Sequence, residues 1–375
     1  MAETTAVGSE GPASEPGVAG SGDSVGSFPL EVGVVWLLFI ADAVAIAVTY
    51  SRVPARELYH VSGSGLEGGA SRVLVFSNYS TAPVAIAVLV VVADRLSRPI
   101  AKGAAVVALV LCAAVFWPGV VDQAHLDARP VNAIAAVGVL VALALTVAAL
   151  RQLGRPQWSR KQPGDRVRAG AAAAAVVVGL PWLAAELGFF LDRVPLVGRV
   201  YQTGKIEWET PTLHHLIPTV HHGHHHGLDA VLLLLTALLL SRVAPSVRRR
   251  WLRVSLGAYL ALMVAYAIGN MANDAWHEQV VKRGWTNWLV PDVVRPTLSV
   301  AWALIVVGTV VLYLLAAGGR AVRGRSVRSR RRQFVRNATD GPAGRYLTWQ
   351  HLSSPGVGTA IASRGKASSR CARRR

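Results

Sequence analysis

The chain has 375 residues, of which 52% are hydrophobic and only 16% are charged, with a mean hydropathy of +0.39. Soluble domains contain roughly 25% charged residues, so this composition excludes an ordinary soluble protein and indicates one that lipid surrounds. The two cysteines, Cys112 and Cys371, exclude a disulfide framework and a cysteine-rich metal site.

The N-terminal segment 1–28 is rich in Gly, Ala, Ser and Glu and contains no Lys or Arg. A cleavable signal peptide carries basic residues directly before its apolar core. We therefore expect a disordered cytoplasmic tail over 1–28, followed by an uncleaved membrane helix. We further expect one transmembrane helical domain over 29–318 and a basic, mostly disordered cytoplasmic tail over 319–375.

A helix needs about 20 predominantly apolar residues to cross roughly 30 Å of hydrocarbon. Eight segments approach this length: 30–50, 73–93, 101–118, 131–150, 169–190, 228–244, 251–271 and 297–317. The fold class that we predict is an all-α integral membrane protein, a polytopic bundle of about eight transmembrane helices.

Basic residues are distributed unevenly between the connections. Most of the 39 Lys and Arg residues follow the second, fourth, sixth and eighth apolar segments. Because cytoplasmic loops are enriched in Lys and Arg, both termini should be cytoplasmic in a multi-pass protein of the cell (plasma) membrane. The same placement explains the net charge of +18 through topology and contact of the basic tail with anionic lipids, and argues against a nucleic-acid partner.

Seven of the 11 histidines lie in the sequence HHLIPTVHHGHHHGLD at 214–229, in a predicted outer connection. Neutral imidazole is a ligand for divalent transition metals such as Zn, Fe and Cu. In a helix that begins near Thr219, three of these histidines would share one face with Asp229. Gly223 and Gly227 favour a turn instead. The candidate metal ligands are His214, His215, His221, His222, His224, His225, His226, Asp229 and His277.

A second polar stripe is predicted at the end of the seventh segment. Asn270, Asn273, Asp274 and His277 repeat at helical spacing, with Glu278 beside them. Such a stripe should face protein or water rather than lipid. With Glu186 from the end of the fifth segment, it would lie at the membrane level of the histidines. The candidate catalytic residues, which would move protons, are Glu278, Asp274 and Glu186.

Two further features have competing interpretations. Asp42 lies within the first apolar segment, where a carboxylate is either a proton or ion relay or a protonated hydrogen-bonding partner of a neighbouring helix. Trp276, Trp285 and Trp288, with Trp208 before the histidines, are typical of an aromatic belt at the outer interface.

The HGHHH motif at 222–226 resembles the HxxHH box of membrane di-iron desaturases and hydroxylases. Those families use several such boxes, usually on the cytosolic side. This sequence has one box, on the predicted outer side, and His277 is not part of an HExxH motif. We therefore assign the chain to no family.

Our leading hypothesis is metal-dependent chemistry on a lipid or membrane-proximal substrate, with the ion activating water or oxygen. One alternative is a metal transporter or metal-handling permease, with the histidines as a capture loop and Asp42 as a relay. The others are a metal-scavenging or pH-sensing loop, and a structural membrane subunit with incidental histidines. Whether the protein is an enzyme stays open at this point.

Overall fold

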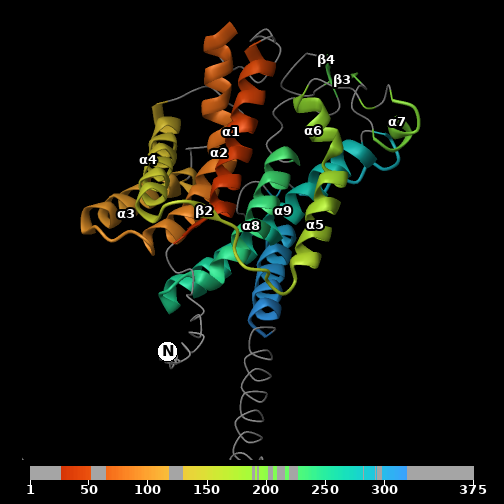
Figure 1. Ribbon diagram of the computed structural model, residues 1–375. Helices are drawn as coiled ribbons and strands as arrows, with labels where there is room; N and C mark the ends of the chain where they lie inside the picture. The colour runs from red at the N-terminus through yellow and green to blue at the C-terminus, as the bar shows by residue number, and fades with distance from the viewer. Residues whose placement is uncertain are drawn as a thin grey trace, which may run out of the picture. The chain divides into compact units, whose positions relative to one another are not determined.

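Helices make up most of the computed structural model (Figure 1). The structure describes residues 27–51, 65–117, 130–187, 191, 194–201, 206–208, 216–218, 227–281, 283–291, 293 and 298–318. Within these ranges, six helices are long and apolar enough to cross a membrane: Leu30–Val48, Pro99–Phe116, Ala133–Leu153, Gly227–Ser246, Arg250–Val281 and Val300–Gly318. The all-helical membrane protein is thus confirmed, whereas the count of eight and the sides of the termini stay predictions.

The elements follow one another as β1 (Phe28–Pro29), α1 (Leu30–Ser51), α2 (Gly65–Ala93), α3 (Pro99–Ala113), η2 (Ala114–Phe116), α4 (Pro130–Leu153), β2 (Pro156–Gln157), α5 (Asp165–Val178), α6 (Leu180–Glu186), α7 (Val197–Val200), β3 (Ile206–Trp208), β4 (Leu216–Pro218), α8 (Gly227–Val243), η4 (Ala244–Ser246), α9 (Arg250–Trp276) and η5 (His277–Val281). The helix over Val300–Gly318 follows them. The compact unit of the chain ends at Tyr313, and Leu314–Arg375 forms a second unit.

Two predicted spans differ from the other six. The backbone of α2 covers the segment 73–93, but side chains are described in only part of it, and the apolar helix Ser80–Ala93 within that part is shorter than a span. The predicted segment 169–190 is divided at Gly179 into α5 and α6. Pro181 has no N–H for the carbonyl of Val177, and the Tyr201 hydroxyl donates to that carbonyl at 2.5 Å. The fifth segment is therefore helical but kinked, with a side chain that replaces the missing helical bond.

The core of the bundle lies around α8, which is apolar on all sides. An evenly apolar helix is expected to be surrounded by protein. Accordingly 72% of the α8 window is buried, against 6% of the window in Val300–Gly318. The helices α1, α2, α5 and α9 pack on α8. At Gly179, an added Cβ would lie 2.6 Å from Val231, so this glycine permits the close approach of α5 and α8.

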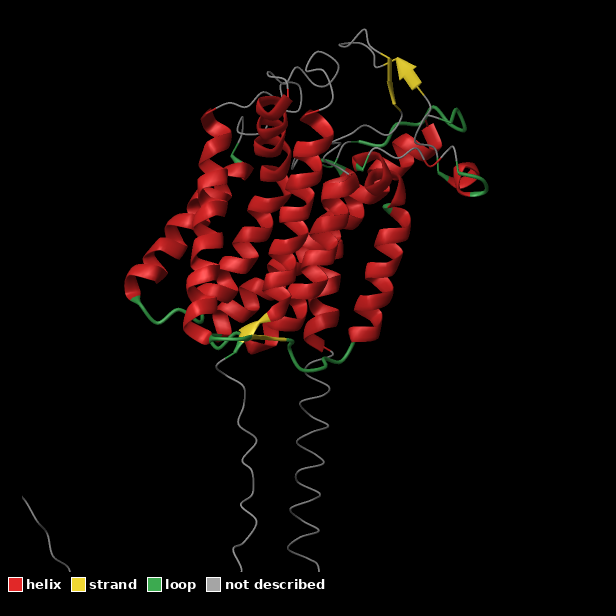
Figure 2. Cartoon of the chain, turned by 45° about the horizontal axis from the view of Figure 1, so that its top comes forward, coloured by secondary structure: helices red, strands yellow, loops and turns green. Residues whose placement is uncertain are grey.

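The basic connections after α2, α4 and α8 meet at one end of the helices. β1 pairs in parallel with β2, which brings the start of α1 to the segment after α4. Asp94, after α2, accepts a hydrogen bond of 2.7 Å from the N–H of Arg248, before α9. Figure 2 shows β1 and β2 at one end of the helices and β3 and β4 at the other. These loops share a side, as the positive-inside pattern requires.

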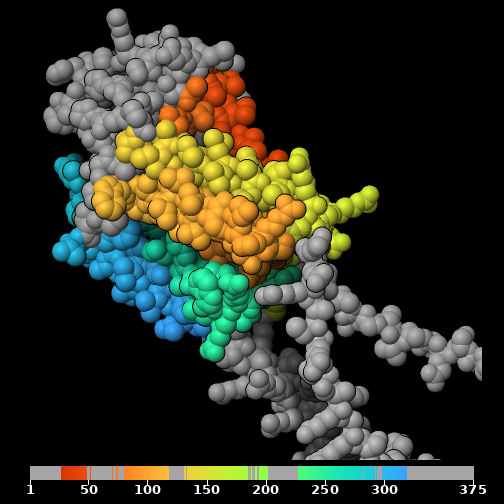
Figure 3. Space-filling view, turned by 90° about the vertical axis from the view of Figure 1, so that its left-hand side faces the viewer, coloured from red at the N-terminus to blue at the C-terminus, as the bar shows by residue number. Residues whose placement is uncertain are grey.

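The outward faces of α3 and α4 are apolar. The two helices lie side by side on the face shown in Figure 3. Val106, Val107 and Val110 of α3 and Leu140 of α4 have most of their side-chain surface exposed. Exposed valine and leucine over two helices are unfavourable in water but suit a surface covered by acyl chains.

Candidate functional site

The clustered histidines lie outside the residues that the structure describes: His214, His215, His221, His222, His224, His225 and His226. Asp229, Asp274, His277 and Glu278 are described, and Glu186 is described by its backbone in the last turn of α6. In this described part of the chain, no group of three or more His, Cys, Asp or Glu side chains is placed to hold a metal ion. The histidine metal site therefore stays a prediction.

Gly227 begins α8 directly after the histidine run. A Cβ atom at this position would lie only 2.1 Å from Cδ2 of the Trp182 ring, so the contact requires glycine. Trp182 of α6 is buried, and its Nε1–H donates a hydrogen bond of 2.7 Å to Oε2 of Glu278. The residue after His226 thus packs on the indole that holds a carboxylate. We call this region, with Asp229 and Asp274, the carboxylate end of the bundle.

The polar stripe at the end of α9 faces protein, as predicted. Asn270, Asn273 and Asp274 are buried, and Glu278 is 2% exposed. The Asn273 Nδ2 donates a hydrogen bond of 2.9 Å to the carbonyl oxygen of Pro291. Burial of amides and carboxylates is costly without polar contacts. The stripe is therefore an interior feature of the carboxylate end rather than a solvated helix face.

One turn of π-helix, η5, ends α9 and contains His277 and Glu278. Such turns occur frequently at functional sites. Nε2 of His277 accepts a hydrogen bond of 3.1 Å from the N–H of Val290, which assigns the ring proton to Nδ1. In this arrangement neither ring nitrogen presents a lone pair to an ion. His277 would have to release Val290 before it could act as a ligand.

Three tryptophans, Trp276, Trp285 and Trp288, lie at the end of α9 and in the segment after η5. Nε1 of Trp276 donates a hydrogen bond of 2.9 Å to the carbonyl of Trp288, and the two rings meet edge to face at 5.6 Å. Trp285 and Trp288 are largely exposed. This arrangement agrees with an aromatic belt, in which the rings lie at the boundary between lipid and water.

Asp42 and Asp229 place two carboxylates in the interior, on α1 and α8. Each is 7% exposed, and Asp229 lies near enough to act electrostatically on Asp42. Ser80 of α2 is fully buried and lies near the Asp229 side chain, and its hydroxyl has no hydrogen-bond partner among the described residues. Asp229 therefore turns toward α1 and α2. This placement favours an interior role for Asp229 over that of one more ligand beside the histidines.

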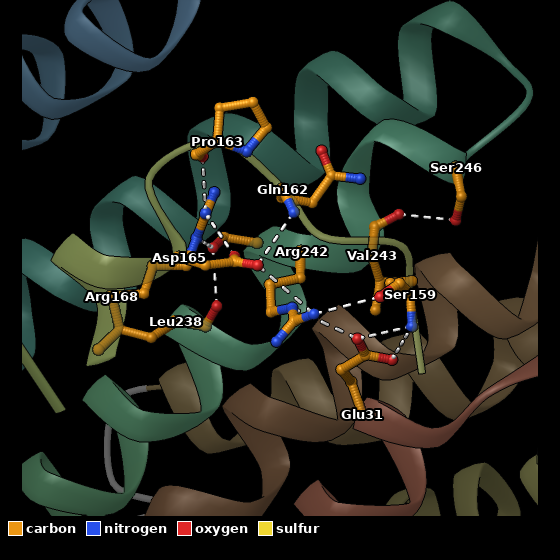
Figure 4. A network of polar contacts seen from close by, with 11 residues as sticks. Glu31, Ser159, Gln162, Pro163, Asp165, Arg168, Leu238, Arg242, Val243 and Ser246 are labelled. Atoms are coloured by element: carbon orange, nitrogen blue, oxygen red, sulfur yellow. Dashed lines mark hydrogen bonds and ion pairs between the residues drawn. The ribbon is translucent and has the colours of Figure 1, made fainter. Parts of the chain in front are cut away.

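A charged network at the other end of α8 has no counterpart in the sequence prediction (Figure 4). Glu31 is fully buried at the start of α1, and its carboxylate accepts a hydrogen bond of 3.0 Å from the N–H of Ser159. Arg242 of α8 approaches Glu31 at 3.5 Å and Asp165 of α5 at 3.6 Å. Arg242 also donates to the carbonyl of Ser159 at 3.2 Å and lies 5.8 Å from the Trp158 ring centroid.

Arg168 extends this network along α5. It pairs with Asp165 at 3.1 Å and donates a hydrogen bond of 2.7 Å to the hydroxyl of Ser241. We call this region, with Glu31, Ser159 and Arg242, the arginine end. A faint signal for it exists in the sequence, since Glu31 and Arg242 are charges in the first and last turns of apolar helices. Which partner each would find could not be deduced from spacing.

No protein-family model, curated protein or solved structure matches this chain.

Proposed function

We propose that this membrane protein binds a divalent transition-metal ion through the histidines at 214–226, and that the ion serves chemistry on a lipid or membrane-proximal substrate. The observation that carries the proposal is the contact of Gly227 with Trp182, whose indole N–H binds Glu278. It connects the residue after His226 to a buried carboxylate through one side chain. Metal-bound imidazoles commonly donate their second ring N–H to a carboxylate, and Glu278 is the carboxylate that we propose for this role.

The donor chemistry suits Zn, Fe or Cu, since imidazole binds all three. Such an ion supplies Lewis-acid or redox chemistry when bound. His222, His225 and His226 are the proposed ligands, because they would share one face of a helix that begins near Thr219. Glu278 would hold a proton or orient an imidazole, with its Oε2 positioned by Trp182. Asp274 supplies a second buried carboxylate one helical turn earlier.

The test is elemental analysis of the detergent-purified full-length protein by mass spectrometry. The wild type is compared with the His222→Ala/His225→Ala/His226→Ala variant. His351→Ala, a histidine outside the cluster, is the matched control. We expect about one ion per chain in the wild type and in the control, and at least a tenfold loss in the triple variant, since it lacks its ligands.

The element found would then decide between the two kinds of chemistry. Zinc would direct the search to hydrolysis of lipid-linked substrates, and iron or copper to oxidation. A metal content far from stoichiometric, or one unchanged in the triple variant, would overturn the proposal. The histidines would then act as a scavenging segment or a pH sensor.

A metal-handling permease is the second candidate. The observation that favours it is the interior pair Asp42 and Asp229, since transporters place ionisable groups within the bilayer. Uptake of the identified metal into proteoliposomes separates the two functions. Transport that is lost in Asp42→Asn, with the bound metal content unchanged, would favour the permease.

A further inference from the structure

The helices α1, α2 and α8 meet around a group of buried oxygen atoms. Asp42 on α1, Asp229 on α8 and Ser80 on α2 are at most 7% exposed. Ser80 lies near Asp229, although its hydroxyl has no hydrogen-bond partner among the described residues, and Asp229 acts electrostatically on Asp42. Among the described residues, Oδ2 of Asp42 has no hydrogen-bond partner. The group thus contains a carboxyl oxygen, Oδ2 of Asp42, that accepts no hydrogen bond from the described residues.

This group must be neutralised, either by a bound cation or by protons. Two carboxylates close together in a medium of low dielectric constant repel one another, and burial of each is costly. α1 contains no Lys, Arg or His along its whole length. The basic residue of α8, Arg242, is held at the arginine end by Glu31 and Asp165. A small cation between the carboxylates would offset both the repulsion and the burial.

α2 adds oxygen donors at the same level. Pro83 lies inside this helix, and because proline has no N–H, the carbonyl of Tyr79 loses its helical partner. That carbonyl is adjacent in sequence to Ser80 and Thr81. Thr81 is also buried, and its hydroxyl has no hydrogen-bond partner among the described residues. Backbone carbonyls released from helical bonding, with carboxylate and hydroxyl oxygens, are the donors of sodium sites in membrane proteins.

We propose that Asp42, Asp229 and Ser80 bind one sodium ion between α1, α2 and α8, with oxygen atoms of the Tyr79–Thr81 segment as further donors. A sodium ion suits a site made only of oxygen atoms, since it is a hard cation. The proposal is independent of the transition-metal site because it uses no histidine. The carboxylate end would then bind a sodium ion in addition to the transition-metal ion of the proposed function.

The experiment measures the thermal unfolding midpoint of the full-length protein in detergent, with a chelator present to remove transition metals. Sodium chloride is titrated against potassium chloride and choline chloride at constant ionic strength. For the wild type, we expect the midpoint to rise with the logarithm of sodium concentration, as ligand linkage requires, and to stay constant in the other salts. The chelator keeps failure of the metal site separate from failure of this one.

Three variants locate the effect. Asp42→Asn should abolish the sodium dependence, and Ser80→Ala should weaken apparent sodium affinity by about tenfold, since it removes one polar contact to the site. Thr146→Val is the control, because it removes a buried hydrogen bond with Trp36 away from the site and should leave the sodium dependence intact.

Two results would overturn the proposal. One is equal stabilisation of the wild type by the three salts, a result that does not depend on any variant folding. The other is a carboxylic-acid carbonyl band in the infrared spectrum that disappears in Asp42→Asn and is insensitive to sodium. That band would show that a proton, rather than sodium, neutralises the pair.

Discussion

The two ends of α8 treat buried charge in different ways. At the arginine end, the fully buried Glu31 has both a cation, Arg242, and a backbone N–H within bonding distance. At the carboxylate end, Glu278 is held by the neutral N–H of Trp182. In the same region, the buried Asp42 lies within electrostatic range of a second buried carboxyl group, that of Asp229. One end pairs a carboxylate with a cation, and the other gathers carboxyl groups without a cation among the described residues.

This difference assigns different roles to the two regions. The arginine end connects α1, α5 and α8 through contacts between opposite charges, so its main effect should be on stability. The carboxylate end gathers buried carboxyl groups, one of them on α8 two residues after Gly227, which directly follows the seven histidines. Intramembrane carboxylates are rare and are usually functional. Variants at the arginine end should therefore change stability, and variants at the carboxylate end should also change ion binding.

The largest expected effect is that of Arg242→Ala. It leaves the buried Glu31 carboxylate without its cation and removes the contact with Trp158. Removal of one partner from a buried ion pair typically costs about 3–5 kcal/mol. Because Arg242 is 23% exposed, we expect the lower part of this range, about 3 kcal/mol, from denaturant or thermal unfolding in detergent.

Arg168→Ala is the control within the same network. Arg168 and Asp165 are each about a quarter exposed, and pairs of that kind contribute about 1 kcal/mol or less. The metal content should be unchanged in both variants. A similar loss of stability in the two variants would show that burial of Glu31 does not govern the arginine end, and the comparison between the ends would fail.

The fold could be predicted from the sequence to the extent that hydropathy determines it. Six of the predicted spans are helices long and apolar enough to cross a membrane, since backbone groups in lipid must be satisfied within a helix. The kink at Gly179 was missed because hydropathy is the same on both sides of it. Pro181 was the available signal, but the replacement of its lost bond by Tyr201 depends on tertiary structure.

The candidate site was predictable only in part. Helical spacing indicated that Asn270, Asn273 and Asp274 share a face directed at protein, and the structure buries all three. Spacing could not reveal Trp182, because a tryptophan in an apolar helix resembles any other core residue. Its role arises from the packing of α6 on the start of α8, which brings its indole to Glu278.

The second prediction tests the packing at the carboxylate end. In Gly227→Ala, the new Cβ would overlap the Trp182 ring, which is too rigid to yield at its edge. We expect a loss of about 2 kcal/mol in stability, typical of overpacking, together with a lower metal content because Trp182 and Glu278 shift. Unfolding and elemental analysis of the same preparation measure both effects.

Gly103→Ala is the matched control for this substitution. Gly103 lies inside α3, and a Cβ added there meets no atom within 4 Å. Alanine should leave the metal content unchanged and raise stability by up to about 1 kcal/mol through its helix propensity. A metal content that is the same in both variants would contradict a link between Gly227 and the ion site.

The smallest expected effect comes from Trp182→Phe, which keeps an aromatic ring against Gly227 but removes the hydrogen bond to Glu278. A hydrogen bond to a charged group contributes roughly 1.5 kcal/mol, so Trp182→Phe should lower stability by about that amount. Trp276→Phe is the control, because it loses a hydrogen bond to an exposed carbonyl and should cost about 0.5 kcal/mol. Trp182→Phe should also lower metal affinity, measured by competition with a chelator, because Glu278 is no longer held. Equal behaviour of the two variants would mean that the Glu278 contact is an ordinary packing detail. In that case the histidines would have no structural connection to the buried carboxylates, and the metal proposal would depend on the histidine sequence alone.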